Sequence, residues 1–101
     1  EAEVRARDVE DQVRAEVEAA LLDLDSGHEQ VVVALDRLRL ADEEVAQASE
    51  RFRNGVAGNI EVINAQLSLL RARDAEIDAR FAVAAARVAL ARATGVAREI
   101  Q

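Results

Sequence analysis

The sequence predicts an all-α fold, a long antiparallel two-helix coiled-coil hairpin, and three observations support it. The 101 residues include no proline, and a third of them are charged, which is typical of long helices and coiled coils. Apolar residues recur every three or four positions along two long stretches. One short segment rich in glycine and asparagine separates these stretches. A chain of this length forms one domain at most, here a single hairpin over residues 1–101.

The first expected helix covers about residues 3–53 and carries an unbroken heptad. Large and small side chains alternate in two columns with seven-residue spacing: Val17, Leu24, Val31, Leu38, Val45 and Phe52, and Ala20, Gly27, Ala34, Ala41 and Ala48. Such a ladder is typical of a coiled-coil seam. A break at Gly27 would instead give a three-helix bundle. Because the heptad keeps its register there, and an interior glycine costs a helix only about 1 kcal/mol relative to alanine, we favour a continuous helix.

A tight turn is expected at residues 54–58. The Asn54-Gly55 pair suits the left-handed conformation that ends helices. Asn59 is a good N-cap for a helix from Ile60, and Glu61 lies in the first turn, where the helix dipole favours negative charge. Because the link is short, the two helices must run antiparallel and pack on each other.

The second expected helix, about residues 59–94, has two apolar stripes. The larger side chains form one stripe, interrupted by Asp74: Ile60, Ile63, Leu67, Leu70, Ile77, Phe81, Ala84, Val88 and Ala91. The small side chains form the other: Ala65, Ser68, Ala72, Ala75, Ala79, Ala82, Ala86, Ala89 and Ala93. Their five-residue offset is about 150° around a coiled-coil helix, so the stripes lie on nearly opposite faces.

We expect the large stripe to pack on the first helix and the alanine stripe to contact a neighbouring helix, as in one stave of a wall or ring. Alanine lets two helices approach closely, and each alanine buries less area than leucine would. The alternative is that alanine serves helix formation alone and that its stripe is solvated.

Composition excludes several classes of function. Residues 1–54 carry 15 Asp and Glu against 7 Arg, a net charge of −8, and residues 55–101 carry 5 against 6, a net charge of +1. With no basic cluster and two aromatic residues, nucleic-acid binding is not expected. The chain has no cysteine, and His28 has no spaced partner, so we expect no metal site and no cofactor. No catalytic constellation is recognisable, so we expect no enzyme.

The turn and its flanks resemble the tip of the periplasmic helical hairpin in TolC-like outer-membrane efflux proteins. The resemblance rests on Arg51-Phe52-x-x-Gly55-Val56-Ala57, followed by Glu61-Val62-x-x-Ala65-Gln66, and on an Ala/Leu-rich helix end that reaches Gly95. The resemblance covers nearly all of this chain. It corresponds to only one of the two homologous hairpins that a full family member has. Because the chain also starts at Glu1 without methionine, we interpret it as a fragment of a longer protein.

The resemblance implies a homo-trimer in the full-length protein, in the outer membrane of a Gram-negative bacterium. A β-barrel would continue into a periplasmic barrel of helices, of which this hairpin is a wall segment that does not itself span the membrane. The tip would dock with a periplasmic adapter (membrane fusion) protein and thereby serve an inner-membrane pump. The implied docking residues are Phe52, Asn54, Gly55, Val56, Ala57 and Gly58.

Two further positions match those that ring the inner end of the tunnel in the best-known members, where both are acidic. Glu61 keeps the carboxylate and would act as a tunnel gate, whereas Asn64 departs from the pattern and puts a second acidic ring in doubt. The alternative for Glu61 is a plain first-turn acid. The implied contact between hairpins is the helix-packing stripe of Ala65, Ala72, Ala75, Ala79, Ala82, Ala86 and Ala89.

A different class of function also fits the helical pattern. A free-standing coiled-coil scaffold, or an adapter-type hairpin, would self-associate into a helical bundle through its exposed apolar positions. The tip of an adapter hairpin carries an Arg-Leu-rich pattern, which is absent from this turn.

Overall fold

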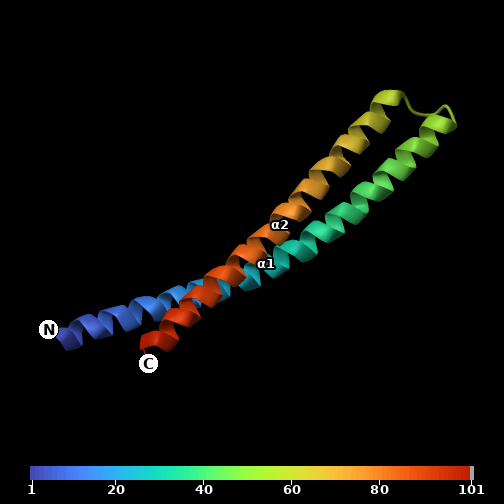
Figure 1. The fold of residues 1–101 in the computed structure, drawn as a ribbon. Coiled ribbons are helices and arrows are strands. Elements are labelled where there is room, and N and C mark those ends of the chain that lie inside the picture. The colour runs from blue at the N-terminus through green and yellow to red at the C-terminus, as the bar shows by residue number, and fades with distance from the viewer. Residues whose placement is uncertain (101) are drawn as a thin grey trace. The chain divides into compact units, whose positions relative to one another are not determined.

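The computed structural model describes residues 1–100 as two α-helices joined by one turn (Figure 1). Helix α1 spans Ala2–Arg53 and helix α2 spans Asn59–Ile100. No strand occurs in this part of the chain, and the all-α hairpin is confirmed. Helix α1 runs through Gly27 without a break, which excludes the three-helix bundle.

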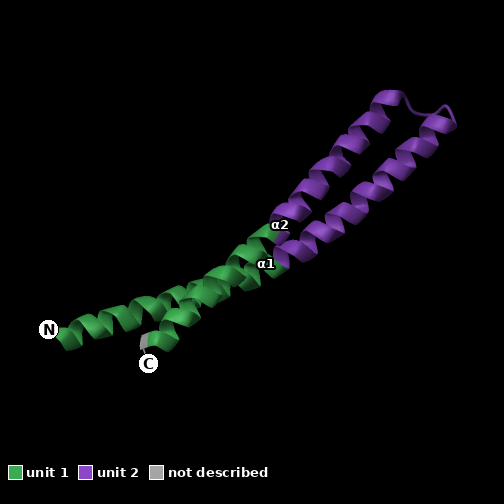
Figure 2. Cartoon of the chain, viewed as in Figure 1, with its two compact units in different colours: residues 1–28, 81–101 green, residues 29–80 purple. Residues whose placement is uncertain are grey.

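The chain divides into two compact units (Figure 2). The tip unit comprises residues 29–80, and the terminal unit comprises residues 1–28 and 81–101. In each unit, one stretch of α1 pairs with one stretch of α2.

The heptad of α1 forms the packed seam, as its spacing predicts. Its small column is buried, with Ala34, Ala41 and Ala48 in the tip unit and Ala20 and Gly27 in the terminal unit. The large column between them, from Val17 to Val45, is half-buried. Small side chains at alternate seam positions let the backbones approach closely, and the valines and leucines cover the flanks of the contact.

The assignment of the two α2 stripes to their neighbours was wrong. Of the alanine stripe, Ala65, Ala79, Ala86 and Ala93 are buried within the hairpin and Ala72 is half-buried, whereas Ala75, Ala82 and Ala89 are exposed. The large side chains expected to pack on α1 are instead exposed on the opposite face: Ile60, Ile63, Leu67, Leu70, Ile77, Phe81 and Val88.

The reason is a second heptad in α2 that resembles the heptad of α1. Its members are buried or half-buried, with one small column and one larger column: Ala65, Ala72, Ala79, Ala86 and Ala93, and Val62, Leu69, Glu76, Val83 and Leu90. This seam lies two residues, or about 200° of helix rotation, from the large stripe. The two heptads have the same alternation of small and larger side chains, and they pack together. In the sequence of α2 the heptad is hard to recognise, because Glu76 interrupts its larger, apolar column.

In the terminal unit, the closest fit in the seam is between Gly27 and Val83. A Cβ atom added to Gly27 would lie 2.9 Å from Val83 Cγ2 and 3.6 Å from Val83 Cα. A real Cβ does not approach another carbon so closely, because the repulsion between the two atoms rises steeply below about 3.5 Å. Glycine therefore leaves the space that Val83 occupies.

The end of α2 also differs from the expectation. We expected the helix to end near residue 94 with Gly95 as its terminator, but α2 continues to Ile100. A terminating glycine adopts a positive φ angle, and among the described residues only Gly55 does so. The Thr94 hydroxyl is satisfied inside the helix, where it donates to the carbonyl oxygens of Leu90, at 2.9 Å, and Ala91, at 3.1 Å.

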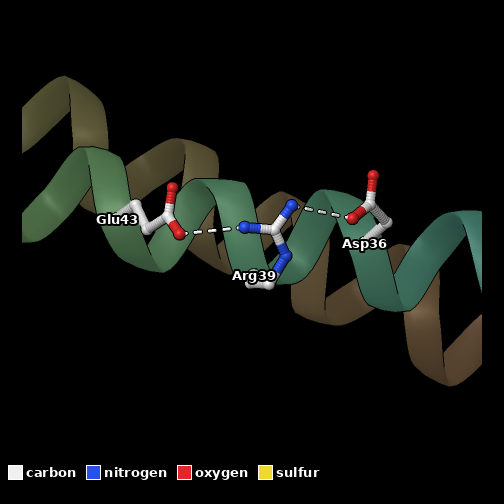
Figure 3. A network of polar contacts seen from close by, with 3 residues as sticks. All are labelled: Asp36, Arg39 and Glu43. Carbon is white, nitrogen blue, oxygen red and sulfur yellow. Dashed lines mark hydrogen bonds and ion pairs between the residues drawn. The ribbon is translucent and has the colours of Figure 1, made fainter.

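The exposed face of α1 in the tip unit carries a small ion-pair network (Figure 3). Arg39 Nη2 donates to Asp36 Oδ1 at 3.0 Å, and Arg39 Nη1 donates to Glu43 Oε1 at 2.9 Å. The hydrogen bond to Asp36 and the charges of both carboxylates raise the pKa of Arg39 above its ordinary value. All three side chains are more than half exposed, so solvent screens these pairs.

Candidate functional site

The turn between the helices has a defined hydrogen-bonded geometry. Gly55 has φ +73°, a left-handed conformation that its Asn-Gly context predicts. The Gly55 N–H donates to the Phe52 carbonyl at 3.1 Å, and the Val56 N–H donates to the Arg51 carbonyl at 2.9 Å. This pair of bonds is the Schellman motif, which satisfies carbonyl groups that the end of a helix leaves open. The turn is therefore held by its backbone.

Arg51 is the residue of this turn that the sequence analysis missed as a participant. Its carbonyl also accepts the Ala57 N–H at 3.3 Å, and its guanidinium pairs with the Glu61 carboxylate across the turn. Residues 51 and 61 lie at similar distances from the centre of the turn, so counting outward along an antiparallel hairpin would have identified this pair. Both side chains are nearly half exposed, so the pair is worth at most about 1 kcal/mol.

The predicted gate residues differ in their surroundings. Glu61 is partnered by Arg51, and its backbone N–H donates to the Gly58 carbonyl at 3.3 Å in the first turn of α2. Asn64 is exposed, and its side chain makes no hydrogen bond with the described residues. Within one copy of the chain, the structure does not bring these two side chains into a shared polar contact.

The surface of the turn is unobstructed, and apolar side chains are exposed on it. Val56 is 75% exposed and Phe52 is 48% exposed, while Ala57 is half-buried. A Cβ atom added at Gly55 or Gly58 would meet nothing within 4 Å. The tip therefore offers apolar groups and unobstructed backbone to a partner.

The outer face of α2 is the second candidate surface. Seven large apolar side chains, each 45% to 74% exposed, form what we call the outer stripe: Ile60, Ile63, Leu67, Leu70, Ile77, Phe81 and Val88. Phe81 and Val88 belong to the terminal unit, and the others to the tip unit. Single exposed apolar residues are common on proteins, but a regular row of them along one helix face marks an interaction surface.

The described residues contain no group of three or more His, Cys, Asp or Glu that could hold a metal ion. Nor does any helix in this range have the length and hydropathy needed to cross a membrane. The two candidate surfaces present exposed aliphatic groups, one aromatic ring each and a few flanking charges.

Comparison with known proteins identifies one family. The family model described as outer membrane efflux protein matches residues 1–96, which include the turn and most of both helices. No curated protein and no solved structure matches the chain significantly.

Proposed function

Because the chain belongs to the outer membrane efflux protein family, we propose that its hairpin is a wall segment in the periplasmic helical barrel of the channel. The chain is a component of an outer-membrane efflux channel. In the proposed arrangement, three copies of the full-length protein form the tunnel. The tip docks with a periplasmic adapter protein, which connects the tunnel to an inner-membrane pump. The family match favours this function over a free-standing scaffold.

The observation that carries the proposal is the outer stripe of α2. A two-helix hairpin in water needs one apolar face per helix, and α2 already uses one of its faces in the seam with α1. Its second apolar face lies on nearly the opposite side and consists of large side chains. A helix with apolar residues on two opposite faces has neighbours on both sides, as a helix in a wall does.

The wall role predicts the effect of a charge on the outer stripe. Phe81 is 74% exposed, so Phe81→Glu should change the free energy of unfolding of the 101-residue chain by no more than about 0.5 kcal/mol. In the assembled channel the same carboxylate would be buried without a partner, which typically costs several kcal/mol. We therefore expect the full-length variant to lose its trimer, as measured by light scattering of the purified channel.

Arg87→Glu is the matched control. Arg87 is exposed on the same helix but lies about 100° or more around it from Phe81 and Val88, outside the outer stripe, so this variant should keep both hairpin stability and trimer. A Phe81→Glu channel that forms trimers as well as the Arg87→Glu channel would contradict the wall role.

The tip role rests on the geometry of the turn. The Schellman motif fixes the path of residues 51–56, and the exposed Phe52 and Val56 and the half-buried Ala57 lie on or beside it. Asn54 and Gly58 complete the proposed docking surface, with Gly55 at its centre. Because Arg51 pairs with Glu61, the two charges balance at the proposed gate, which has a net negative charge from Glu61 only when that ion pair opens. Asn64 adds no charge there.

Replacing Gly55 tests the tip. At φ +73° an L-residue is strained by about 1–2 kcal/mol, and a β-branched residue by more, so Gly55→Val should rearrange the turn while both helices remain. We expect the full-length variant to form trimers but to lose adapter binding and efflux of a fluorescent dye. Gly55→Asn should retain most of both, because asparagine tolerates the left-handed conformation. Normal dye efflux by the valine variant would refute the docking role.

A further inference from the structure

The turn contains the pair Asn54-Gly55, which is prone to a spontaneous reaction of its own backbone. The backbone nitrogen that follows an asparagine can attack the carbonyl carbon of the asparagine side chain. A glycine at the following position favours this attack, because it has no Cβ atom to hinder the approach and its backbone adopts many conformations. The surroundings of Asn54 and Gly55 in the folded turn then determine how readily the reaction proceeds.

The reaction at this pair consumes water and releases ammonia. The Gly55 backbone nitrogen loses its proton and forms a bond to Asn54 Cγ, and the side-chain amide nitrogen of Asn54 leaves as ammonia. Water then opens the resulting succinimide ring. Cleavage of the new bond to Cγ gives aspartate, whereas cleavage of the bond to the main-chain carbonyl carbon gives isoaspartate. Neither product is oxidised or reduced relative to asparagine, so the turn and water are sufficient.

The structure leaves room for the ring. Asn54 is exposed and lies just beyond the end of helix α1 at Arg53. Its side chain makes no hydrogen bond with the described residues. A Cβ atom added at Gly55 would meet nothing within 4 Å, so open space surrounds the residue that supplies the attacking nitrogen. No neighbouring group therefore blocks the approach of the two reacting atoms.

The backbone of the folded turn nevertheless restrains the reaction. The Gly55 N–H donates to the Phe52 carbonyl at 3.1 Å, and the Asn54 N–H donates to the Glu50 carbonyl at 3.0 Å. The Gly55 nitrogen must give up its hydrogen bond before it can lose its proton and turn towards the side chain. Exposed loops open locally at a lower free-energy cost than a packed core, and such opening frees this nitrogen.

The two other asparagines of the chain each lack one of these conditions. Asn59 precedes Ile60, whose β-branched side chain hinders the approach of the backbone nitrogen. Asn64 precedes Ala65 inside helix α2, and Ala65 is buried in the seam with α1. The backbone nitrogen of Ala65 is freed only when that part of the seam opens. Of the three asparagines, Asn54 alone combines an exposed amide with an unhindered nitrogen in a turn.

We propose that Asn54 is a site of spontaneous deamidation, and that opening of the turn sets the rate. The reaction needs the turn alone and does not depend on the proposed channel role. Either product places a carboxylate at the C-terminal end of α1, where the helix dipole disfavours negative charge. Isoaspartate also lengthens the backbone by one carbon atom, which disrupts the Schellman hydrogen bonds of Gly55 and Val56. Deamidation thus changes both the charge and the shape of the turn.

Peptide mapping of the 101-residue chain tests the site. Cleavage by trypsin after Arg53 and Arg71 releases residues 54–71, a single peptide that contains all three asparagines. After incubation of the folded chain at mildly alkaline pH, we expect the mass increase of amide-to-acid conversion at Asn54 but not at the other two. Fragmentation of the peptide assigns the position. A sample digested at time zero gives the background, and circular dichroism checks that the helices remain.

A parallel incubation in concentrated guanidinium chloride measures the restraint that the turn imposes. The Gly55 nitrogen is free in the unfolded chain, so conversion of Asn54 should be faster than in the folded chain on the order of tenfold, as expected for loss of a backbone hydrogen bond. Asn54→Gln is the matched control. Glutamine keeps the amide but must close a larger ring, so position 54 should show no mass increase over the same period.

Three results would overturn the inference. If Asn54 stays intact in the folded chain while the unfolded chain converts completely, the turn holds this residue unreactive. If Asn59 or Asn64 converts as fast as Asn54 in the folded chain, the turn does not select the site. If the folded and unfolded chains convert at equal rates, the hydrogen bond from Gly55 to Phe52 imposes no restraint.

Discussion

Replacing Glu76 with leucine should stabilise the hairpin, raising the free energy of unfolding by about 1–4 kcal/mol. Glu76 is 8% exposed and occupies a seam position of α2 in the tip unit. The equivalent positions before and after it are apolar: Val62, Leu69, Val83 and Leu90. A buried ionic group replaced by a well-packed apolar one of similar volume usually gains stability, because its desolvation cost disappears.

The surroundings of Glu76 give it little compensation for that cost. Its carboxylate pairs with Arg80, one turn along α2, but the Arg80 side chain is 66% exposed. The ion pair joins Arg80 Nε to the buried Oε1 of Glu76, and this oxygen has no further hydrogen-bond partner among the described residues. A single contact with an exposed guanidinium offsets only part of the desolvation cost of a buried carboxylate.

Urea unfolding followed by circular dichroism measures the change, and Arg80 supplies the control. Arg80→Ala should destabilise the natural chain, because Glu76 then loses the only ion-pair partner that it has in the described structure. In a Glu76→Leu background the same substitution should have almost no effect. An equal cost of Arg80→Ala in both backgrounds, or a leucine variant less stable than the natural chain, would contradict this account of the seam.

The Glu76 site also explains which part of the fold could be predicted from the sequence. The heptad of α1 has no interruption from Val17 to Phe52, so its spacing alone identified the correct face. Local chemistry was equally informative at the turn, where an Asn-Gly pair requires few assumptions about the rest of the chain. Hydrophobic spacing and turn residues determine local structure over a few residues, so the buried face of α1 and the position of the turn can be predicted from them.

The orientation of α2 could not be predicted in the same way. Both of its stripes have helical spacing, and the large stripe would bury more apolar area, which favoured it as the seam. The structure instead pairs two heptads of similar composition, and Glu76 makes the correct column of α2 look discontinuous. The missing information was complementarity between two distant faces, which a single helix pattern does not contain. The repeated alternation of valine and leucine in both helices was the available signal.

For the candidate surfaces too, part could be predicted from the sequence and part could not. The apolar residues of the tip could be identified by motif, but the role of Arg51 follows from pairing across the turn. The outer stripe was visible as a pattern, yet its availability depends on which stripe the hairpin buries. The surroundings of Asp74 could be described only once the buried stripe was known, because an acid in a buried seam and an acid on an exposed face have different partners.

Replacing Gly27 with alanine should destabilise the hairpin although alanine is the better helix former. The exchange contributes about 1 kcal/mol to helix formation, whereas forcing an extra methyl group into a packed contact typically costs about 1–3 kcal/mol. The new Cβ would lie 2.9 Å from Val83 Cγ2, and valine cannot easily rotate away because its χ1 angle is restricted in a helix. We expect a net loss of up to about 2 kcal/mol in the free energy of unfolding.

A double-mutant cycle with Val83→Ala isolates this contact. Val83→Ala alone should destabilise the chain by about 1–2 kcal/mol, because two buried methyl groups are lost. In that background Gly27→Ala should become stabilising by about 1 kcal/mol, since the clash is gone and the helix propensity remains. Gly95→Ala is the matched control: Gly95 also lies inside a helix, but a Cβ there would meet nothing within 4 Å. It should stabilise the chain in both backgrounds. If Gly27→Ala behaves like Gly95→Ala in the natural chain, the close fit of α1 on Val83 is wrong.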